Sequence, residues 1–232
     1  MENQTNLSND QVFIKGKNTH ISLNEWLNKM KIAFSNGKQA QFQSLLSSVS
    51  YDEAKLDELL EQIKAIEQLA QAQKKEYAAQ YEATSKLEEK RNAINETYMK
   101  HFALCKILLK NNVKAQAALE FSGNRKSAYS EWYQQVANFY AQLLNTPEFL
   151  SDISSINIVE ADLTAVQTAL EELSTLKEKQ KSAMAKAQKS TETRDKAFES
   201  LYPLYSDYIS YAKVLFSNEQ DLEALGITVR RD

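Results

Sequence analysis

The feature that most constrains the fold is a run from Asp52 to Asn111 that contains neither glycine nor proline. Positions spaced alternately three and four residues apart are apolar at both ends of this run, as at Leu56, Ile63 and Ile94. The same positions are small or polar in its middle: Ala70, Gln73, Gln80, Thr84 and Arg91. A heptad spacing of this kind aligns one stripe of side chains with a partner helix. We therefore expect long helices with coiled-coil character.

Turn residues are scarce in the whole chain, with four glycines and two prolines among 232 residues. A protein with many strands needs those residues in its tight turns, so the composition favours helices over sheets. The hydrophobic fraction of 43% is ordinary for a globular protein. The expected fold class is all-α, with tandem helical units that form a bundle of long antiparallel helices.

Charge and hydropathy limit the classes of partner. The chain carries 28 Lys and Arg against 31 Asp and Glu, a net charge of -3, so no global field attracts nucleic acid or an anionic lipid surface. Cys105 is the only cysteine, which excludes an internal disulfide. The first twenty residues lack the apolar core of a signal peptide, and no later stretch approaches the roughly 20 apolar residues of a membrane span. We expect a cytoplasmic protein without a membrane span.

Matching residues recur at an offset of 106 or 107 positions. Glu25-Trp26 returns as Glu131-Trp132, and the segment from Glu53 to Leu56 returns from Glu160 to Leu163. Near the end of each half, Ala118-Leu119 is matched by Ala224-Leu225. A tryptophan, a helix start and a closing segment held at nearly one offset indicate an internal repeat. The predicted organisation is a flexible polar arm (1–21), repeat 1 (22–121), repeat 2 (128–227) and a tail (228–232).

Each repeat is expected to hold a short helix with a tryptophan (about 22–36 and 128–145) and a long helical region (about 52–111 and 159–217). Thr84-Ser85 and Ser190-Thr191 lie at matching places in the long regions, and Ser85 with Glu88 fits a capping box, so the chain could reverse there. The unbroken heptad phase favours one continuous helix instead. Between these alternatives we expect the hairpin.

Scattered motifs in repeat 2 carry a resemblance to a known group. They are Trp132, Asn138-Phe139, Asn145-Thr146-Pro147, Arg194-Asp195 and the closing segment from Leu225 to Arg230. With these motifs, repeat 2 resembles uncharacterised bacterial all-helical proteins with a Trp/Asn-Phe early helix and a closing Leu-Gly-Ile/Leu-Thr-Val segment. No activity is established for that group. Its members carry a Thr-Arg-Thr-Pro-like break that implies a hairpin, whereas this chain has no proline between Lys181 and Lys189.

Residues for catalysis or metal binding are few. A hydrolytic triad needs a histidine beside a nucleophile, and the chain has only His20 and His101. Neither has the Glu three residues before it that helical metal sites use, because those positions are Lys17 and Tyr98. No Cys-x-x-Cys motif or glycine-rich phosphate loop occurs. The sequence therefore offers no catalytic, cofactor-binding or metal-binding residues, and we expect no enzyme.

Tyrosines form the one candidate interaction surface. They recur at three-residue spacing in one helical segment: Tyr202, Tyr205, Tyr208 and Tyr211. Such a cluster is typical of a binding surface, although the same rings can equally pack against a helical bundle. Arg91 and Arg194, on the polar part of the seam, are expected to pair with an acid on a neighbouring helix or to extend to solvent.

Three functions remain. The first is a non-catalytic interaction or scaffold protein that binds a protein partner or a second copy of the chain. The alternative is a small-molecule carrier with an apolar pocket between helices, lined by Tyr, Met and Trp. The last is an enzyme that uses carboxylates and tyrosines alone. The lack of recognisable catalytic motifs and the heptad seam favour the interaction or scaffold protein.

Overall fold

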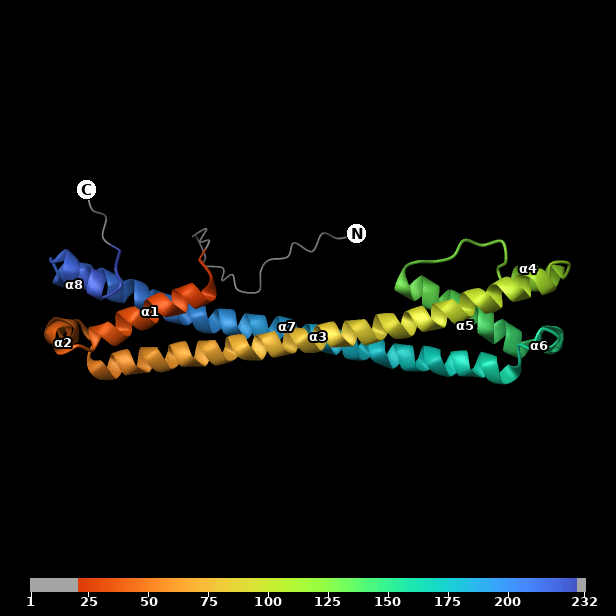
Figure 1. Ribbon diagram of the computed structural model, residues 1–232, viewed down its shortest axis with the longest axis horizontal. Coiled ribbons are helices and arrows are strands. Elements are labelled where there is room, and N and C mark those ends of the chain that lie inside the picture. Colours follow the sequence, from red (N-terminus) through yellow and green to blue (C-terminus); the bar gives the residue numbers. More distant parts are fainter. Residues whose placement is uncertain (1–20, 229–232) are drawn as a thin grey trace. The chain divides into compact units, whose positions relative to one another are not determined.

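The computed structural model describes residues 21–228, so the predicted arm and tail lie almost entirely outside the described residues. Within this range the regular elements are all helices, and the predicted all-α class is confirmed. The helices are α1 Leu23–Gly37, α2 Ala40–Leu46, the short 3-10 helix η1 Ser47–Val49, α3 Glu53–Leu108, α4 Val113–Ala118, α5 Tyr129–Asn145, α6 Pro147–Ser154, α7 Glu160–Leu215 and α8 Glu219–Ala224 (Figure 1).

The two long regions are single helices of 56 residues each, so the expected hairpin is wrong. Two hydroxyl groups in the segments where a turn was expected form hydrogen bonds inside the helix. Thr84 Oγ1 donates to the carbonyl of Gln80 at 2.9 Å, and Thr191 Oγ1 donates to the carbonyl of Ala187 at 3.2 Å. A Thr that bonds the preceding turn in this way is accommodated inside an α-helix. The heptad phase was the better guide.

Local chemistry at the helix ends follows the sequence. Ser22 Oγ accepts from the backbone N–H of Glu25 and caps α1, while Asp52 Oδ1 accepts from the N–H of Lys55 and caps α3. Residues with left-handed backbone follow helices at matching places, first at Ser50 and Asn157 and again at Glu120 and Gly226. Each such residue lets the chain turn sharply after the helix that precedes it.

The described residues form two compact units (Figure 1). The first, here named the split unit, combines the described parts of Met1–Glu76 and Lys186–Asp232, so it holds α1, α2, α8, the first part of α3 and the last part of α7. The second, here named the continuous unit, spans Tyr77–Ala185 and holds α4, α5, α6 and the other parts of α3 and α7. Each unit therefore takes helices from both predicted repeats.

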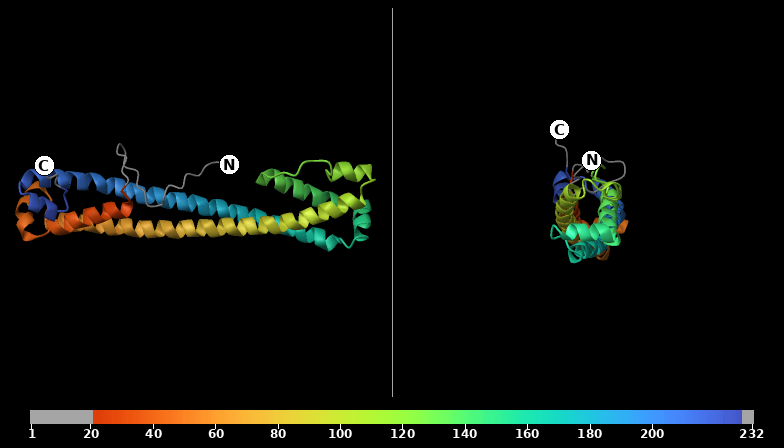
Figure 2. Two further views of the ribbon diagram at one scale, coloured as in Figure 1. Left: turned by 45° about the horizontal axis from the view of Figure 1, so that its top comes forward. Right: turned by 90° about the vertical axis from the view of Figure 1, so that its right-hand side faces the viewer.

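Within each unit α3 and α7 lie side by side and run antiparallel, as expected (Figure 2). In the continuous unit Gln180 bonds Thr84 while Lys90 pairs with Glu172, so residue numbers fall along α7 as they rise along α3. In the split unit Gln73 Nε2 donates to Thr191 Oγ1 at 2.8 Å. The long helices thus form the spine of each unit, and the short helices cover it.

Each unit has its own apolar core, built from large side chains of the short helices against the heptad seam. The core of the split unit includes Leu27, Phe34, Phe42, Leu56, Ile63, Phe198 and Tyr208. The core of the continuous unit includes Ile94, Tyr98, Trp132, Phe139, Phe149, Leu163 and Leu170. Burial of such side chains, at about 1.5–3 kcal/mol each, is the main stabilising term in either unit.

The two long helices match in length and in spacing along the chain. The long helices are equal in length, and their first residues, Glu53 and Glu160, are 107 positions apart. The left-handed residues Ser50 and Asn157 keep the same offset. These matches fit a tandem duplication, whose common origin stays a prediction, as does the division into repeats. Among the described residues, no helix is long and apolar enough to cross a membrane.

Candidate functional site

The four tyrosines of the predicted surface lie in different surroundings. Tyr205 and Tyr208 are buried in the core of the split unit, and the hydroxyl of Tyr208 donates to the carbonyl of Ala33 at 2.9 Å. Tyr202 is partly buried, with its ring edge-on to Trp26 at 5.2 Å between centroids. Tyr211 is 46% exposed. Of the four, Tyr211 is therefore the most accessible to a partner, although its ring also lies 6.0 Å from that of Tyr51, and the inner two serve the core.

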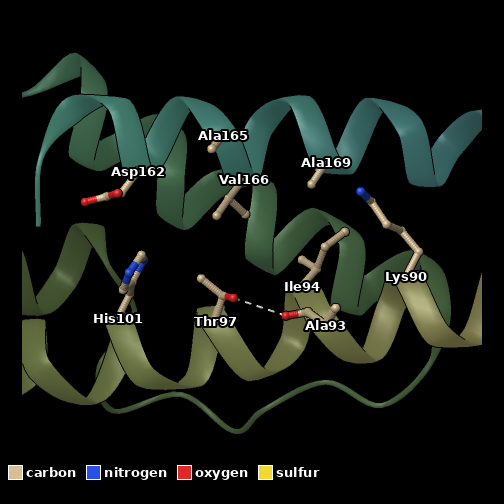
Figure 3. Close-up of a pocket in the computed structure, with 9 residues that line it drawn as sticks. All are labelled: Lys90, Ala93, Ile94, Thr97, His101, Asp162, Ala165, Val166 and Ala169. Atoms are coloured by element: carbon tan, nitrogen blue, oxygen red, sulfur yellow. Dashed lines mark hydrogen bonds between the residues drawn. The ribbon is translucent and has the colours of Figure 1, made fainter.

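A groove lies between α3 and α7 inside the continuous unit, with a volume of about 340 Å³ (Figure 3). We name it the alanine groove, because three of its nine lining residues are alanines. Its lining consists of Lys90, Ala93, Ile94, Thr97 and His101 from α3, and Asp162, Ala165, Val166 and Ala169 from α7. Elsewhere along α3 and α7, longer side chains fill the space between the two helices. At these positions the alanines leave part of that space open.

His101 stands at one end of this groove and is held by a neighbour from α5. Its Nδ1 lies 3.0 Å from the hydroxyl of Tyr140, a buried residue. Desolvation by burial lowers the pKa of His101, Lys100 lowers it further, and Asp162 acts in the opposite direction. Burial raises the pKa of Tyr140, so the phenol keeps its proton. The pair is neutral at pH 7, and Nε2 of His101 has no partner among the described residues.

Opposite charges stand at the two ends of the alanine groove. Lys90 pairs with Glu172 at one end, where both side chains are partly exposed. Asp162 stands at the other end beside His101 (Figure 3). One carboxylate oxygen of Asp162, Oδ2, accepts from the backbone N–H of Val159 at 3.0 Å. Between these ends the walls are mainly aliphatic, so the groove is polar at its ends and apolar in its middle.

Aliphatic side chains are exposed on the last turns of both long helices. Ile107 of α3 is 69% exposed, and Val214, at the corresponding position of α7, is 84% exposed. Leu104 and Leu108 lie beside Ile107 on the same helix face, and both are also exposed. In α7 the counterpart of Leu104 is Tyr211. Each unit thus exposes an apolar helix end, here named the α3 end (Leu104, Ile107, Leu108) and the α7 end (Tyr211, Val214). Leu215, the counterpart of Leu108, packs against the core of the split unit.

The two seam arginines are both held by the protein. Arg194 is 3% exposed, pairs with Asp195 at 2.6 Å and donates to the side-chain oxygen of Gln73. Asp195 is the next residue on the same helix, whereas we expected Arg194 to pair with an acid on a neighbouring helix or to extend to solvent. Arg91 lies over the ring of Trp132 and donates to the carbonyl of Ser127 at 2.7 Å. These contacts are structural.

Metal-binding groups do not gather in the part of the chain that the structure describes. Over residues 21–228 there is no cluster of three or more His, Cys, Asp or Glu that could hold a metal ion. Cys105 is buried, and desolvation raises its pKa to about 12, so the thiol is protonated and inaccessible. The second histidine, His20, lies outside the described residues.

Sequence reasoning missed both surface features. The α3 and α7 ends could have been found from the repeat, because Ile107 and Val214 share one offset and fall off the heptad seam. The alanine groove depends on which alanines of α3 and α7 face each other, and that pairing is set by the antiparallel register of the two helices. A single sequence does not state that register.

Comparisons of the chain with protein-family models, with curated proteins and with solved structures gave no match.

Proposed function

We propose that the chain is a non-catalytic helical interaction protein that binds an amphipathic helix of a partner protein. The observation that carries the proposal is the exposure of aliphatic side chains at corresponding positions, Ile107 and Val214, on the last turns of α3 and α7. A single exposed aliphatic residue is ordinary on any protein surface. The recurrence of the same exposed position in both units supports a shared use.

The spacing of the α3 end fits a helical partner. Ile107 and Leu108 lie three and four residues after Leu104, which is the spacing by which one helix face packs against another helix. The hollow next to it, lined by Leu108, Val113 and polar residues such as Asn112 and Asp152, would supply the polar rim of such a contact.

We also infer that the two repeats share one origin, which would explain why both units carry an apolar helix end. The equal lengths of α3 and α7 and the paired left-handed residues support this duplication. A duplicated unit with two docking positions could bind two copies of one partner, or one partner at two places.

A photo-crosslinking experiment in the cells that make the protein tests this function. A photoreactive amino acid would replace Ile107 in one variant and Val214 in a second, with exposed Lys179 on α7 as the matched control. We expect one and the same protein to be crosslinked at both apolar ends and not at the control. Crosslinks to the chain itself would assign the partner as a second copy. Labelling at 107 and 214 that does not exceed the control would overturn the proposal.

A further inference from the structure

We propose that the alanine groove of the continuous unit binds an extended zwitterion with an apolar middle, namely a short peptide with small aliphatic side chains. This proposal is independent of the helix-binding function, because the groove and the apolar helix ends share no residue. It rests on the size of the groove, on its apolar walls and on the opposite charges at its two ends.

The dimensions fit a peptide of three or four residues. The volume of about 340 Å³ falls within the range of small-molecule sites. Lys90 and His101 are eleven residues apart on one helix, which at 1.5 Å per residue is roughly 16 Å. An extended peptide of three to four residues spans roughly 10 to 14 Å. Such a peptide can reach from near Asp162 to near Lys90 without folding back.

The walls select small aliphatic side chains. Ala93, Ala165 and Ala169 carry only a methyl group, and Ile94 and Val166 add apolar surface between them (Figure 3). A peptide whose side chains are methyl or isopropyl groups would fill the space left by the alanines and lose its own apolar surface to the walls. A large side chain would not fit in the space between the alanines, and a charged one would face aliphatic walls in the middle of the groove.

The two ends match the two termini of a free peptide. At one end Asp162 uses only Oδ2 for Val159, and its Oδ1 has no partner among the described residues, so it can accept from a terminal ammonium group. At the other end the ammonium of Lys90 has three donors, and its pairing with Glu172 is open to solvent. Lys90 can therefore donate to a terminal carboxylate that shares the ammonium with Glu172, whose oxygen lies 2.5 Å from Nζ.

The split unit lacks this groove's features at the corresponding positions, which argues that the groove is not a by-product of the repeat. Leu204 replaces Thr97 and Tyr208 replaces His101. Tyr51 packs beside them, with its hydroxyl donating to the carbonyl of Leu204 at 2.9 Å and its ring 5.3 Å from that of Tyr208. Larger side chains thus stand where the continuous unit keeps small ones.

Isothermal titration calorimetry with trialanine tests the proposal. We expect saturable binding of one trialanine per chain, weakened roughly tenfold or more when the peptide is N-acetylated or C-amidated, because each change removes one charge-assisted contact. Asp162→Asn, which keeps the cap on Val159, should weaken trialanine but leave N-acetyl-trialanine unchanged. Lys90→Gln should weaken trialanine but leave its amide unchanged.

A variant with a filled groove tests whether trialanine binds in the groove itself. Ala165→Leu should abolish trialanine binding, whereas Ala79→Leu, on an exposed face of α3 outside the groove, should not change it. Circular dichroism would show that both variants keep their helices. The proposal is overturned by an absence of saturable heat with millimolar trialanine, by unchanged binding to Ala165→Leu, or by equal affinity for the free and the doubly blocked peptide.

Discussion

The split unit and the continuous unit share an apolar framework but differ in their buried polar residues. Phe42 and Phe149 occupy corresponding places and are both fully buried. In contrast, Arg194 of the split unit is buried where the continuous unit has Leu87, 107 positions earlier. The comparison indicates that the large apolar residues stabilise this fold. The same arrangement of helices tolerates different polar residues in its interior.

The two tryptophans show the same contrast. Trp132 Nε1 donates to Asn95 Oδ1 at 2.8 Å in the continuous unit. The position of Asn95 is taken by Tyr202 in the split unit, where Nε1 of Trp26 is buried and has no hydrogen-bond partner among the described residues. The split unit exchanges one hydrogen bond for an edge-on aromatic contact. Each unit contains one of the two tryptophans, which can report on its unfolding by fluorescence.

The largest effect should come from the shared framework. Phe42→Ala and Phe149→Ala should each lower the free energy of unfolding by about 3–5 kcal/mol, because each removes a fully buried ring and leaves a cavity. Guanidinium unfolding followed by tryptophan fluorescence measures both losses. If the two positions do correspond, the losses should agree to within about 1 kcal/mol, and a large cost at only one of them would break the comparison.

Gln73 and Arg194 test the polar interior of the split unit. Gln73→Leu should cost about 1.5–3 kcal/mol, because it removes a hydrogen bond to a buried guanidinium. The double variant Gln73→Leu with Arg194→Leu, which copies Leu87 of the continuous unit at position 194, should recover most of that loss, because it removes the buried charge together with its buried amide partner. Urea unfolding midpoints of the single and the double variant compare them directly. A greater loss for the double variant than for Gln73→Leu would show that the arginine is itself required.

Gly37 tests how the split unit packs the ring of Tyr208 against α1. A Cβ at Gly37 would meet the hydroxyl of Tyr208 and the side chain of Leu56. Gly37→Ala should therefore cost about 1–3 kcal/mol through overpacking. The loss should be smaller in a Tyr208→Phe background, which a double-mutant cycle measures. The continuous unit has the opposite combination, Leu143 with His101, and equal losses in both backgrounds would refute the steric explanation.

Replacing each tryptophan by phenylalanine tests the value of the Asn95 contact. Trp132→Phe should cost about 1 kcal/mol more than Trp26→Phe, because only the former breaks a hydrogen bond and leaves a polar partner behind. Thermal unfolding followed by circular dichroism gives both values. A larger loss for Trp26→Phe would mean that its contact with Tyr202 is worth more than the hydrogen bond.

His101 should give the smallest effect, a pH dependence of the continuous unit. Because burial lowers its folded pKa below the ordinary value near 6.5, the histidine is neutral in the fold and protonates more readily when unfolded. Its contribution is thus complete above about pH 6.5 and is lost as the pH falls through the folded pKa. Unfolding monitored by Trp132 between pH 7.5 and 5.5 should show this decline, and His101→Gln should flatten it.

Much of the fold could be predicted from residues that act locally. Ser22 and Asp52 are of the residue types that cap helices, and each caps the helix that follows it. The tryptophan helices begin within one residue of the expected places. The hairpin was wrong because Thr84 was assigned to a turn, whereas its hydroxyl bonds inside the helix. The candidate sites were harder, since burial of Tyr208 or opening of the alanine groove depends on which residues of α7 face α3. That register is a tertiary property.

The division of the split unit between two distant segments bears on how the chain folds during synthesis. All residues of the continuous unit, 77–185, leave the ribosome in one stretch, so its antiparallel helices can pair over a shorter loop. The first segment of the split unit must wait for these residues to be added, roughly 5 to 22 s at ordinary elongation rates. During that interval the apolar faces of α1 and of the first part of α3 lack their α7 partner. A cell that makes this protein therefore has reason to shield its first 76 residues, and the slowest folding step should be the closure of the split unit.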